Sequence, residues 1–319
     1  MRVAVIGAGG IGGLYGGLLA RAGHDVSFLA RGAHLRAIQE HGLEVRSAEF
    51  GTFTVKGVAS DDPADLAQAD LVLFAVKTYD LDQAAQAAKQ VLARDSSLLT
   101  FQNGLDAPDQ VAEIVGKEHV LIGTTAVETT ILEPGVIGHL SNFHFVTVSS
   151  LDGPPTPTAE QVAETLRNAG AKATTTADGR QTLWEKAWAL IPMATITAVC
   201  RAPIGEIRNV PETRALIETL LDEISAVALV CGYDLPEARA RAHTMMMEIA
   251  PHGMKASMAR DFERGGRTEL EALTGAIVRL ADAHAVNVPA TRTAYAILKL
   301  RQQVEAGTEN EVGIAAGGR

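Results

Sequence analysis

The sequence predicts an α/β N-terminal domain of the Rossmann type, with a doubly wound and mainly parallel sheet, followed by an all-α C-terminal domain. Three patterns support this fold class: a glycine-rich turn directly after the first strand, alternation of strands and helices through the first half, and almost continuous helical periodicity in the second half. At 319 residues the chain is long enough for two domains. We expect a cofactor-binding domain over residues 1–178 and a helical substrate and dimerisation domain over residues 179–319.

The first strand and turn carry the strongest local signal. The apolar run Val3 to Ile6 leads into G-x-G-x-x-G at Gly7, Gly9 and Gly12, and a helical segment follows. In such a turn the first glycine allows the tight bend, the second lets the backbone approach a diphosphate, and the third lets helix and strand pack closely. The helix N-terminus adds free N–H groups and a partial positive charge. The pattern therefore predicts a dinucleotide site.

The end of the second strand indicates which dinucleotide binds. A site that prefers NAD carries Asp or Glu about 20 residues after the glycines, where the carboxylate bonds the ribose 2′-hydroxyl. Here that place is taken by Arg31, with Arg36 a turn further on. A guanidinium can bind a 2′-phosphate through charge-assisted hydrogen bonds, so we expect NADPH. A solvated arginine at a helix start is the alternative interpretation.

The remaining elements of the first domain follow the same alternation, with two exceptions. Short runs near Leu43–Arg46 and Thr52–Val58 predict an added hairpin, and Glu133-Pro134-Gly135 predicts the turn of another within Glu128–Ser150. The predicted strands are Arg2–Ile6, Asp25–Ala30, Ala69–Val76, Ser97–Gln102, His119–Thr125 and Ala173–Thr176; the predicted helices are Ile11–Ala22, Ala33–His41, Leu81–Leu92, Ala107–Val115 and Ala159–Ala169.

After Asp178 the pattern becomes helical. The predicted helices are Gln181–Val199, Glu212–Cys231, Glu237–Glu248, Arg267–His284 and Ala290–Glu305. In an open α/β sheet ligands bind beside the carboxyl ends of the strands, so we expect the substrate in the crevice between the two domains. The apolar surplus of these helices, including the run Met245 to Met247, makes a homodimer a possible assembly.

Composition excludes several functional classes. The formal net charge of −10 with no basic stripe argues against a nucleic-acid partner. Cys200 and Cys231 fit a reduced, cytoplasmic protein, and we read them as small buried hydrophobes. No metal-ligand spacing occurs among the scattered histidines, so we expect no metal. No apolar window reaches the length of a membrane span, and no signal peptide is visible.

Four polar residues stand out by position. Lys77 and Asn103 each follow a predicted strand, where side chains face the cofactor crevice or simply meet solvent. Lys186 lies in the apolar segment LWEKAWALIP; burial there would lower its pKa and favour proton donation, whereas a lysine that extends along its stem to water is the alternative. Glu269 is expected at the start of a helix, where a carboxylate is ordinary as a cap.

The whole chain resembles the ketopantoate reductase family, the NADPH-dependent 2-dehydropantoate 2-reductases of pantothenate biosynthesis. The motifs that carry the resemblance are, in order, GAGGIGGLYG, VKTYD, FQNGLDA, GTT, LWEKAW, SMARDFERGGRTELEALTG and NVPATRTAY. The resemblance implies NADPH as cofactor and reduction of a 2-oxo acid to a 2-hydroxy acid, with ketopantoate as the first candidate.

The resemblance also implies roles for individual residues. It assigns cofactor binding to Gly7, Gly9, Gly12, Arg31, Lys77 and Asn103, with Arg31 and Lys77 at the 2′-phosphate and Asn103 near the nicotinamide and the reacting carbonyl. It assigns the general acid to Lys186, a substrate-binding serine to Ser257, and substrate binding and lysine orientation to Glu269.

The chain departs from the family at two positions. Family members usually carry asparagines four and eight residues after the lysine, where this chain has Leu190 and Ala194. Loss of polar partners changes discrimination between substrates, so a less polar 2-oxo acid is an alternative substrate. An NADPH-binding sensor without catalysis is the alternative from another class, and the joint presence of Asn103, Lys186 and Glu269 speaks against it.

Overall fold

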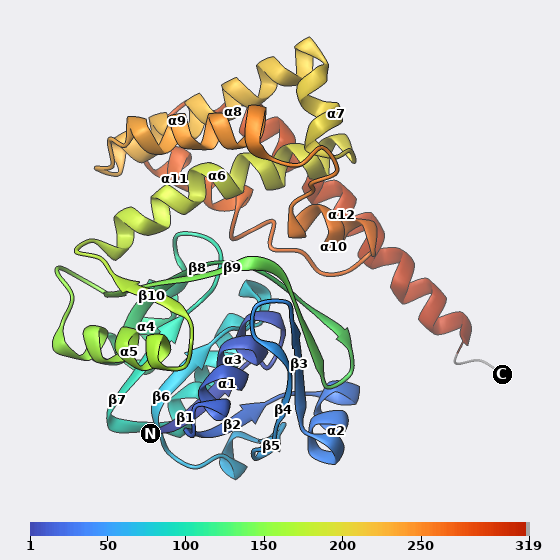
Figure 1. The fold of residues 1–319 in the computed structure, drawn as a ribbon. Coiled ribbons are helices and arrows are strands. Elements are labelled where there is room, and N and C mark those ends of the chain that lie inside the picture. Colours follow the sequence, from blue (N-terminus) through green and yellow to red (C-terminus); the bar gives the residue numbers. More distant parts are fainter. Residues whose placement is uncertain (317–319) are drawn as a thin grey trace. The chain divides into compact units, whose positions relative to one another are not determined.

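The computed structural model describes residues 1–316, with side chains described up to residue 304 (Figure 1). The chain forms two compact units. The first unit consists of Met1–Gln102 and Asp106–Thr182, and the second consists of Asn103–Leu105 together with the chain from Leu183 onward. The short segment Asn103–Leu105 thus belongs with the helical unit, although its neighbours in sequence do not.

The first unit is built on one mixed, mainly parallel sheet. From the edge strand β5 inward, the strands run in the order β5-β2-β1-β6-β7-β8, and each neighbouring pair among them is parallel. After β1 the chain adds β2 and β5 on one side of it, and then adds β6, β7 and β8 on the other side. The boundary between β1 and β6 is therefore the topological switch point, where ligands bind in such sheets. The strands are β1 (Arg2–Ile6), β2 (Asp25–Leu29), β3 (Leu43–Ser47), β4 (Gly51–Val55), β5 (Ala59–Ser60), β6 (Ala69–Phe74), β7 (Leu92–Thr100), β8 (Val120–Glu133), β9 (Val136–Ser150) and β10 (Lys172–Thr175).

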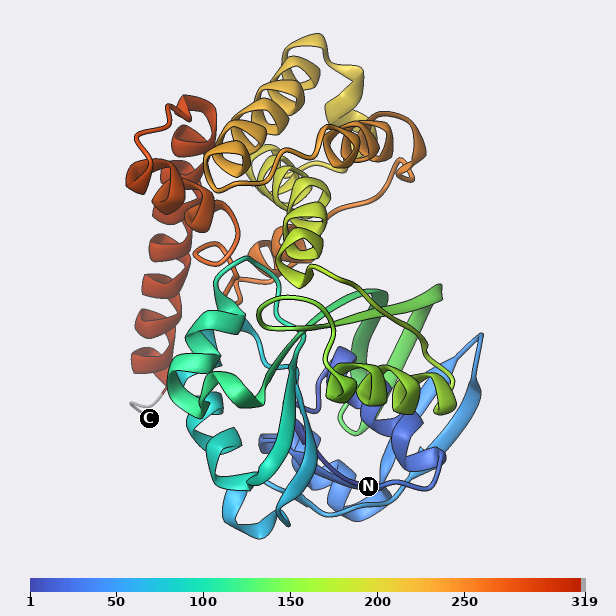
Figure 2. The ribbon, with the colours of Figure 1, turned by 90° about the vertical axis from the view of Figure 1, so that its left-hand side faces the viewer.

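Helices cover both faces of this sheet. Figure 2 shows α3 and α4 on one side of the strands and α5 on the other. The helices are α1 (Gly10–Arg21), α2 (Gly32–His41), α3 (Leu81–Val91), α4 (Ala107–Val115) and α5 (Pro157–Asn168). Both predicted hairpins are present, since β3 pairs with β4 and β8 with β9 in antiparallel fashion. The predicted doubly wound α/β fold class is confirmed for this unit.

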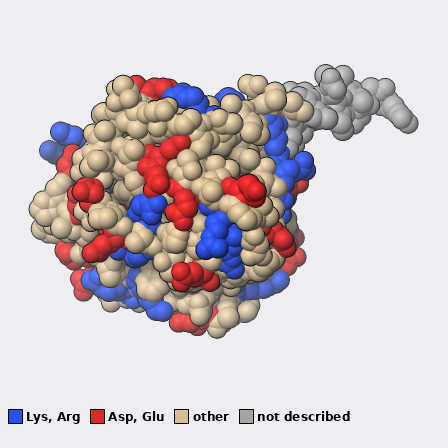
Figure 3. Space-filling model, turned by 90° about the horizontal axis from the view of Figure 1, so that it is seen from above, with Lys and Arg blue, Asp and Glu red and all other residues tan. Residues whose placement is uncertain are grey.

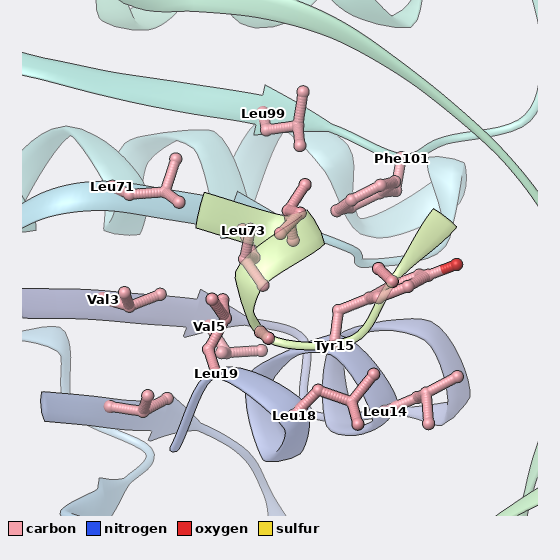
Figure 4. Close-up of a cluster of buried hydrophobic side chains, with 14 of the residues drawn as sticks. Val3, Val5, Leu14, Tyr15, Leu18, Leu19, Leu71, Leu73, Leu99 and Phe101 are labelled. Carbon is pink, nitrogen blue, oxygen red and sulfur yellow. The ribbon is translucent and has the colours of Figure 1, made fainter. Parts of the chain in front are cut away.

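Helix α1 packs against several strands of the sheet. Figure 4 shows Tyr15 and Leu19 directed toward apolar side chains of the sheet, whereas Leu14 and Leu18 lie on another face of the helix; all four belong to the same buried core. A Cβ added at Gly16 would lie 2.6 Å from Cγ2 of Val5 in β1, and one at Gly13 would lie 2.6 Å from Cγ1 of Ile137 in β9. Only glycine at these two positions therefore lets α1 lie this close to both strands of the sheet.

The second unit is helical. Trp188 is fully buried, and its Nε1 donates to Ser225 Oγ at 2.9 Å, which ties α6 to α8. The buried carboxylate of Glu223 in α8 accepts from the N–H groups of Ala290 and Thr291 and so caps α12. The helices are α6 (Gly179–Cys200), whose first turn lies in the first unit, α7 (Ile204–Asn209), α8 (Pro211–Val230), α9 (Pro236–Thr244), α10 (Ser257–Glu263), α11 (Thr274–Ala283) and α12 (Pro289–Ala316).

One helix prediction was wrong in this unit. The helix expected over Arg267–His284 begins only at Thr274, so Glu269 lies in an irregular segment just before the turn at residues 270–273, and not in a first helical turn. The Thr268 hydroxyl accepts from the N–H of Leu270, a local bond that competes with helix formation. The helix expected over Glu237–Glu248 is present: α9 covers Pro236–Thr244, and the chain continues as one π-helical turn, Met245–Ile249. Helices α7 and α10 were not predicted.

The packing of α1 predicts a large cost for the smallest side chain at Gly16. We expect Gly16→Ala to lower the free energy of unfolding by about 1–3 kcal/mol, because the methyl group would overlap the buried Val5 and Phe28 side chains. Urea unfolding measures this loss. Gly253→Ala is the matched control, since a Cβ there meets no atom within 4 Å. Equal stability of Gly16→Ala and the wild type would contradict the close packing.

Candidate active site

The glycine turn after β1 has the geometry that the sequence predicts. Gly7 has a φ of +98°, and a Cβ there would lie 2.8 Å from the backbone N of Val76. A Cβ on Gly12 would overlap the carbonyl oxygen of Gly7. Both positions therefore require glycine for reasons within the protein itself.

Gly9 differs from its two partners, because nothing in the protein occupies the place of its side chain. A Cβ there would meet no atom within 4 Å. Gly9 is the N-cap of α1, no side chain caps this helix end, and no acidic residue stands in its first turn. The result is an open backbone surface at the positive end of a helix, which suits an anion such as a diphosphate.

Two basic residues follow the strands on either side of β1. Arg31 comes just after β2, is exposed, and is the N-cap of α2. Lys77 follows β6, is half-buried, and precedes the short 3₁₀ turn Thr78–Asp80. Because β2 and β6 both neighbour β1, these residues follow strand ends on either side of the glycine turn.

His34 is a residue of this region that the sequence reasoning missed. Its Nδ1 accepts from the N–H of Gly135 at 3.0 Å, so Nε2 carries the proton and donates to the Ala8 carbonyl at 2.8 Å. The imidazole thus ties α2, which begins just after Arg31, to the middle of the glycine turn. Its place in the first turn after Arg31 was the signal available in the sequence.

In the second unit Asn103 and Glu269 form a direct contact. The Asn103 amide nitrogen donates to Oε2 of Glu269 at 3.2 Å, and Glu269 is 4% exposed. Gly104 makes this approach possible: its φ is +103°, and a Cβ there would lie 2.5 Å from the carbonyl oxygen of Ala272. The turn after Glu269 therefore packs directly on the backbone that follows Asn103.

Lys186 interacts electrostatically with Glu269 of this pair. It lies on α6 among the buried residues Leu183, Trp184, Ala187 and Trp188. Burial lowers the pKa of its ammonium group from 10.5 to about 8, while the Glu269 carboxylate acts in the opposite direction. Near pH 8 the side chain therefore exchanges a proton readily, as a general acid or base must.

Ser257 is connected to α6 indirectly. It is the half-buried first residue of α10, and the preceding N–H of Ala256 donates to the Thr197 hydroxyl at 3.4 Å. Thr197 is a fully buried residue of α6. On the same helix Leu190 is half-buried one turn beyond Lys186, and Ala194 is completely buried.

The described residues include neither a candidate metal site nor an activated thiol. Within residues 1–304 no group of three His, Cys, Asp or Glu side chains could hold a metal ion. Burial raises the pKa of both thiols, Cys200 and Cys231, so neither is an activated nucleophile. Basic and acidic residues are interspersed on the face shown in Figure 3. Among the described helices, none combines the length and apolar character of a membrane span.

The electrostatics of this site predict a specific titration. We expect Lys186 to titrate near pH 8 in lysine-detected NMR, and Glu269→Gln to lower that pKa further, because the lost carboxylate stabilised the ammonium form. Glu271→Gln is the control: this nearby carboxylate pairs with Lys299 and Tyr295, and its loss should leave Lys186 unchanged. An unchanged or raised pKa in Glu269→Gln would refute the pairing.

The comparisons with known proteins agree over almost the whole chain. Residues 3–153 match the family model described as ketopantoate reductase PanE/ApbA, and residues 178–302 match the model of its C-terminal domain. A 2-dehydropantoate 2-reductase of Halobacterium salinarum is 32% identical over 305 residues, which cover 95% of this chain and 99% of that protein.

Solved structures show the same similarity. A PanE/ApbA family ketopantoate reductase from Ralstonia eutropha superposes with a TM-score of 0.89 at 33% identity and covers 96% of this chain and 100% of its own. A D-mandelate dehydrogenase solved with NADH and anilino(oxo)acetate shares the fold, with a TM-score of 0.87 at 22% identity over 96% of this chain and all of its own. The chain therefore belongs to the ketopantoate reductase family of oxidoreductases.

Proposed function

We propose that this protein uses NADPH to reduce a 2-oxo acid to the 2-hydroxy acid, with 2-dehydropantoate as the first candidate substrate. The observation that carries the proposal is the half-buried Lys186, with its pKa lowered to about 8, in the field of the Glu269 carboxylate that also accepts from Asn103. A proton donor of this kind is what reduction of a ketone requires, since the product oxygen must be protonated.

The first unit fits a nicotinamide dinucleotide. The open backbone at Gly9 and the uncapped N-terminus of α1 would hold the diphosphate. We propose Arg31 and Lys77 as the ligands of a 2′-phosphate, because a basic residue stands where NAD-preferring sites carry a carboxylate. The D-mandelate dehydrogenase similar in fold was solved with NADH, which supports a nicotinamide cofactor without deciding between the two forms.

The residues of the second unit would then supply the proton that the product oxygen requires. When bound, the reduced nicotinamide supplies a hydride to the keto carbon, and the carbonyl oxygen becomes an alkoxide. Lys186 donates its proton to that oxygen and is afterwards reprotonated from solvent. Glu269 stabilises the ammonium form before transfer and orients Asn103, whose amide we place near the reacting carbonyl. We assign Ser257 to substrate binding.

The identity of the acid depends most on Leu190. It is half-buried one turn beyond Lys186, whereas Ala194 is completely buried, so of the two only Leu190 has surface to offer a substrate. An apolar side chain there favours a less polar 2-oxo acid, which is our second candidate substrate. A non-catalytic NADPH sensor is the third reading, and the assembled Asn103, Lys186 and Glu269 argue against it.

We extend the proposal to the two halves of the chain. Residues 1–178 would bind the cofactor, and residues 179–319 would bind the substrate and support self-association. Met246 and Met247 of the methionine run are buried, while Met245 is partly exposed, so the run contributes mainly to the core. The homodimer and the cytoplasmic location stay predictions.

A panel of 2-oxo acids tests the reaction. We expect NADPH oxidation with ketopantoate or with less polar acids, and Lys186→Ala should lower turnover by roughly 10²–10⁴ with NADPH affinity nearly unchanged. Leu190→Asn should improve ketopantoate relative to apolar acids if Leu190 selects the substrate. Tight NADPH binding without turnover of any acid would favour the sensor, and efficient wild-type reduction of ketopantoate would remove the apolar alternative.

Cofactor choice has its own test. Arg31→Ala should weaken NADPH binding by about 1.5–3 kcal/mol, the scale of a charged hydrogen-bonded contact, and leave NADH nearly unaffected. Calorimetric titration with both cofactors measures the two affinities. Equal losses for NADPH and NADH would show that Arg31 supports the local fold and does not bind the phosphate.

A further inference from the structure

Gln102 is a buried amide that joins the ends of two central strands. It follows β7, and its side chain is 5% exposed. Nε2 donates to the carbonyl oxygens of Phe74 at 2.9 Å and Val76 at 3.0 Å, and Oε1 accepts from the N–H of Phe101 at 3.3 Å. Three hydrogen bonds thus link this one side chain to the backbone at the ends of β6 and β7.

These bonds lie beyond the regular sheet. The last registered pair between β6 and β7 is Phe74 with Thr100, so strand pairing no longer holds Val76. Beyond the last pair of strand residues, the Gln102 side chain takes over the hydrogen bonding to β6 and fixes the position of the Val76 backbone. A buried amide is costly unless its polar atoms are hydrogen-bonded, so any movement that breaks these bonds is opposed.

The segment after β6, Ala75 and Val76, also contacts the glycine turn. A Cβ on Gly7 would lie 2.8 Å from Val76 N and 2.9 Å from the carbonyl carbon of Ala75. The next residue in the chain is Lys77. Ala75 and Val76 therefore lie between Gln102 and the glycine turn, and any shift of Val76 passes directly to Lys77.

We propose that Gln102 is a positioning residue for cofactor selection: it fixes the chain after β6 so that Lys77 reaches the 2′-phosphate of NADPH. The inference rests on the role of Lys77 under the proposed function. Gln102 touches neither cofactor nor substrate in this account. It acts through the Val76 carbonyl, and its loss should therefore lower the preference for NADPH over NADH.

The test is a double-mutant cycle of Gln102→Met and Lys77→Ala, read by calorimetric binding of NADPH and NADH to the enzyme without substrate. Methionine keeps the volume and removes all three hydrogen bonds. We expect Gln102→Met to lower the NADPH-over-NADH preference about fivefold or more, and to lower it no further in the Lys77→Ala background. Gln39→Met is the control, since the exposed Gln39 also donates to a backbone carbonyl, that of Ala59 in the edge strand β5, away from β6 and Lys77.

Each outcome decides the proposal. Equal weakening of both cofactors, or additive effects of the two substitutions, would overturn the role of Gln102 while the assignment of Lys77 stands. An unchanged preference in Lys77→Ala alone would overturn the assignment of Lys77 and this inference together. If Gln102→Met does not fold, Gln102→Asn replaces it: this amide is one methylene shorter and cannot span both carbonyls, so we expect a loss in the same direction.

Discussion

The first unit depends on the close packing of α1 against β1 and β9, two strands of the same sheet. Glycines at positions 13 and 16 remove the side chains that would push the helix away from these strands. A glycine-rich helix has low intrinsic stability, so its order must come from the packing around it. Because the strands hold α1 so tightly, its N-terminus is fixed at the end of β1, where an anion can bind without reorganising the backbone.

In the second unit the ammonium group of Lys186 lies in apolar surroundings. Lys186 sits among buried side chains of α6, and the cost of its charge appears as a lowered pKa. The counter-charge comes from Glu269, which directly precedes the turn that packs against Gly104. Burial lowers the pKa of the lysine toward neutral pH, and the Glu269 carboxylate limits this shift by stabilising the ammonium form.

Local signals in the sequence predicted most of the first unit, because strand, turn and helix follow one another within a few residues. The glycine turn and both hairpins are of this kind. The pairing of Lys186 with Glu269 is non-local, and only the family resemblance suggested it. The helix start before Glu269 was wrong because the Thr268 side chain bonds the backbone. Gln102 and His34 escaped notice because an amide or imidazole bound to distant carbonyls leaves no periodic pattern.

No protein atom fills the space beside Gly9, and under the proposed function a ligand occupies it. Gly9→Ala tests this most directly, because a Cβ there meets no protein atom within 4 Å. We expect a free energy of unfolding within about 0.5 kcal/mol of wild type, together with at least a roughly tenfold weaker affinity for NADPH, because the methyl group takes the space of the diphosphate. Unchanged NADPH affinity in a folded Gly9→Ala protein would contradict the account.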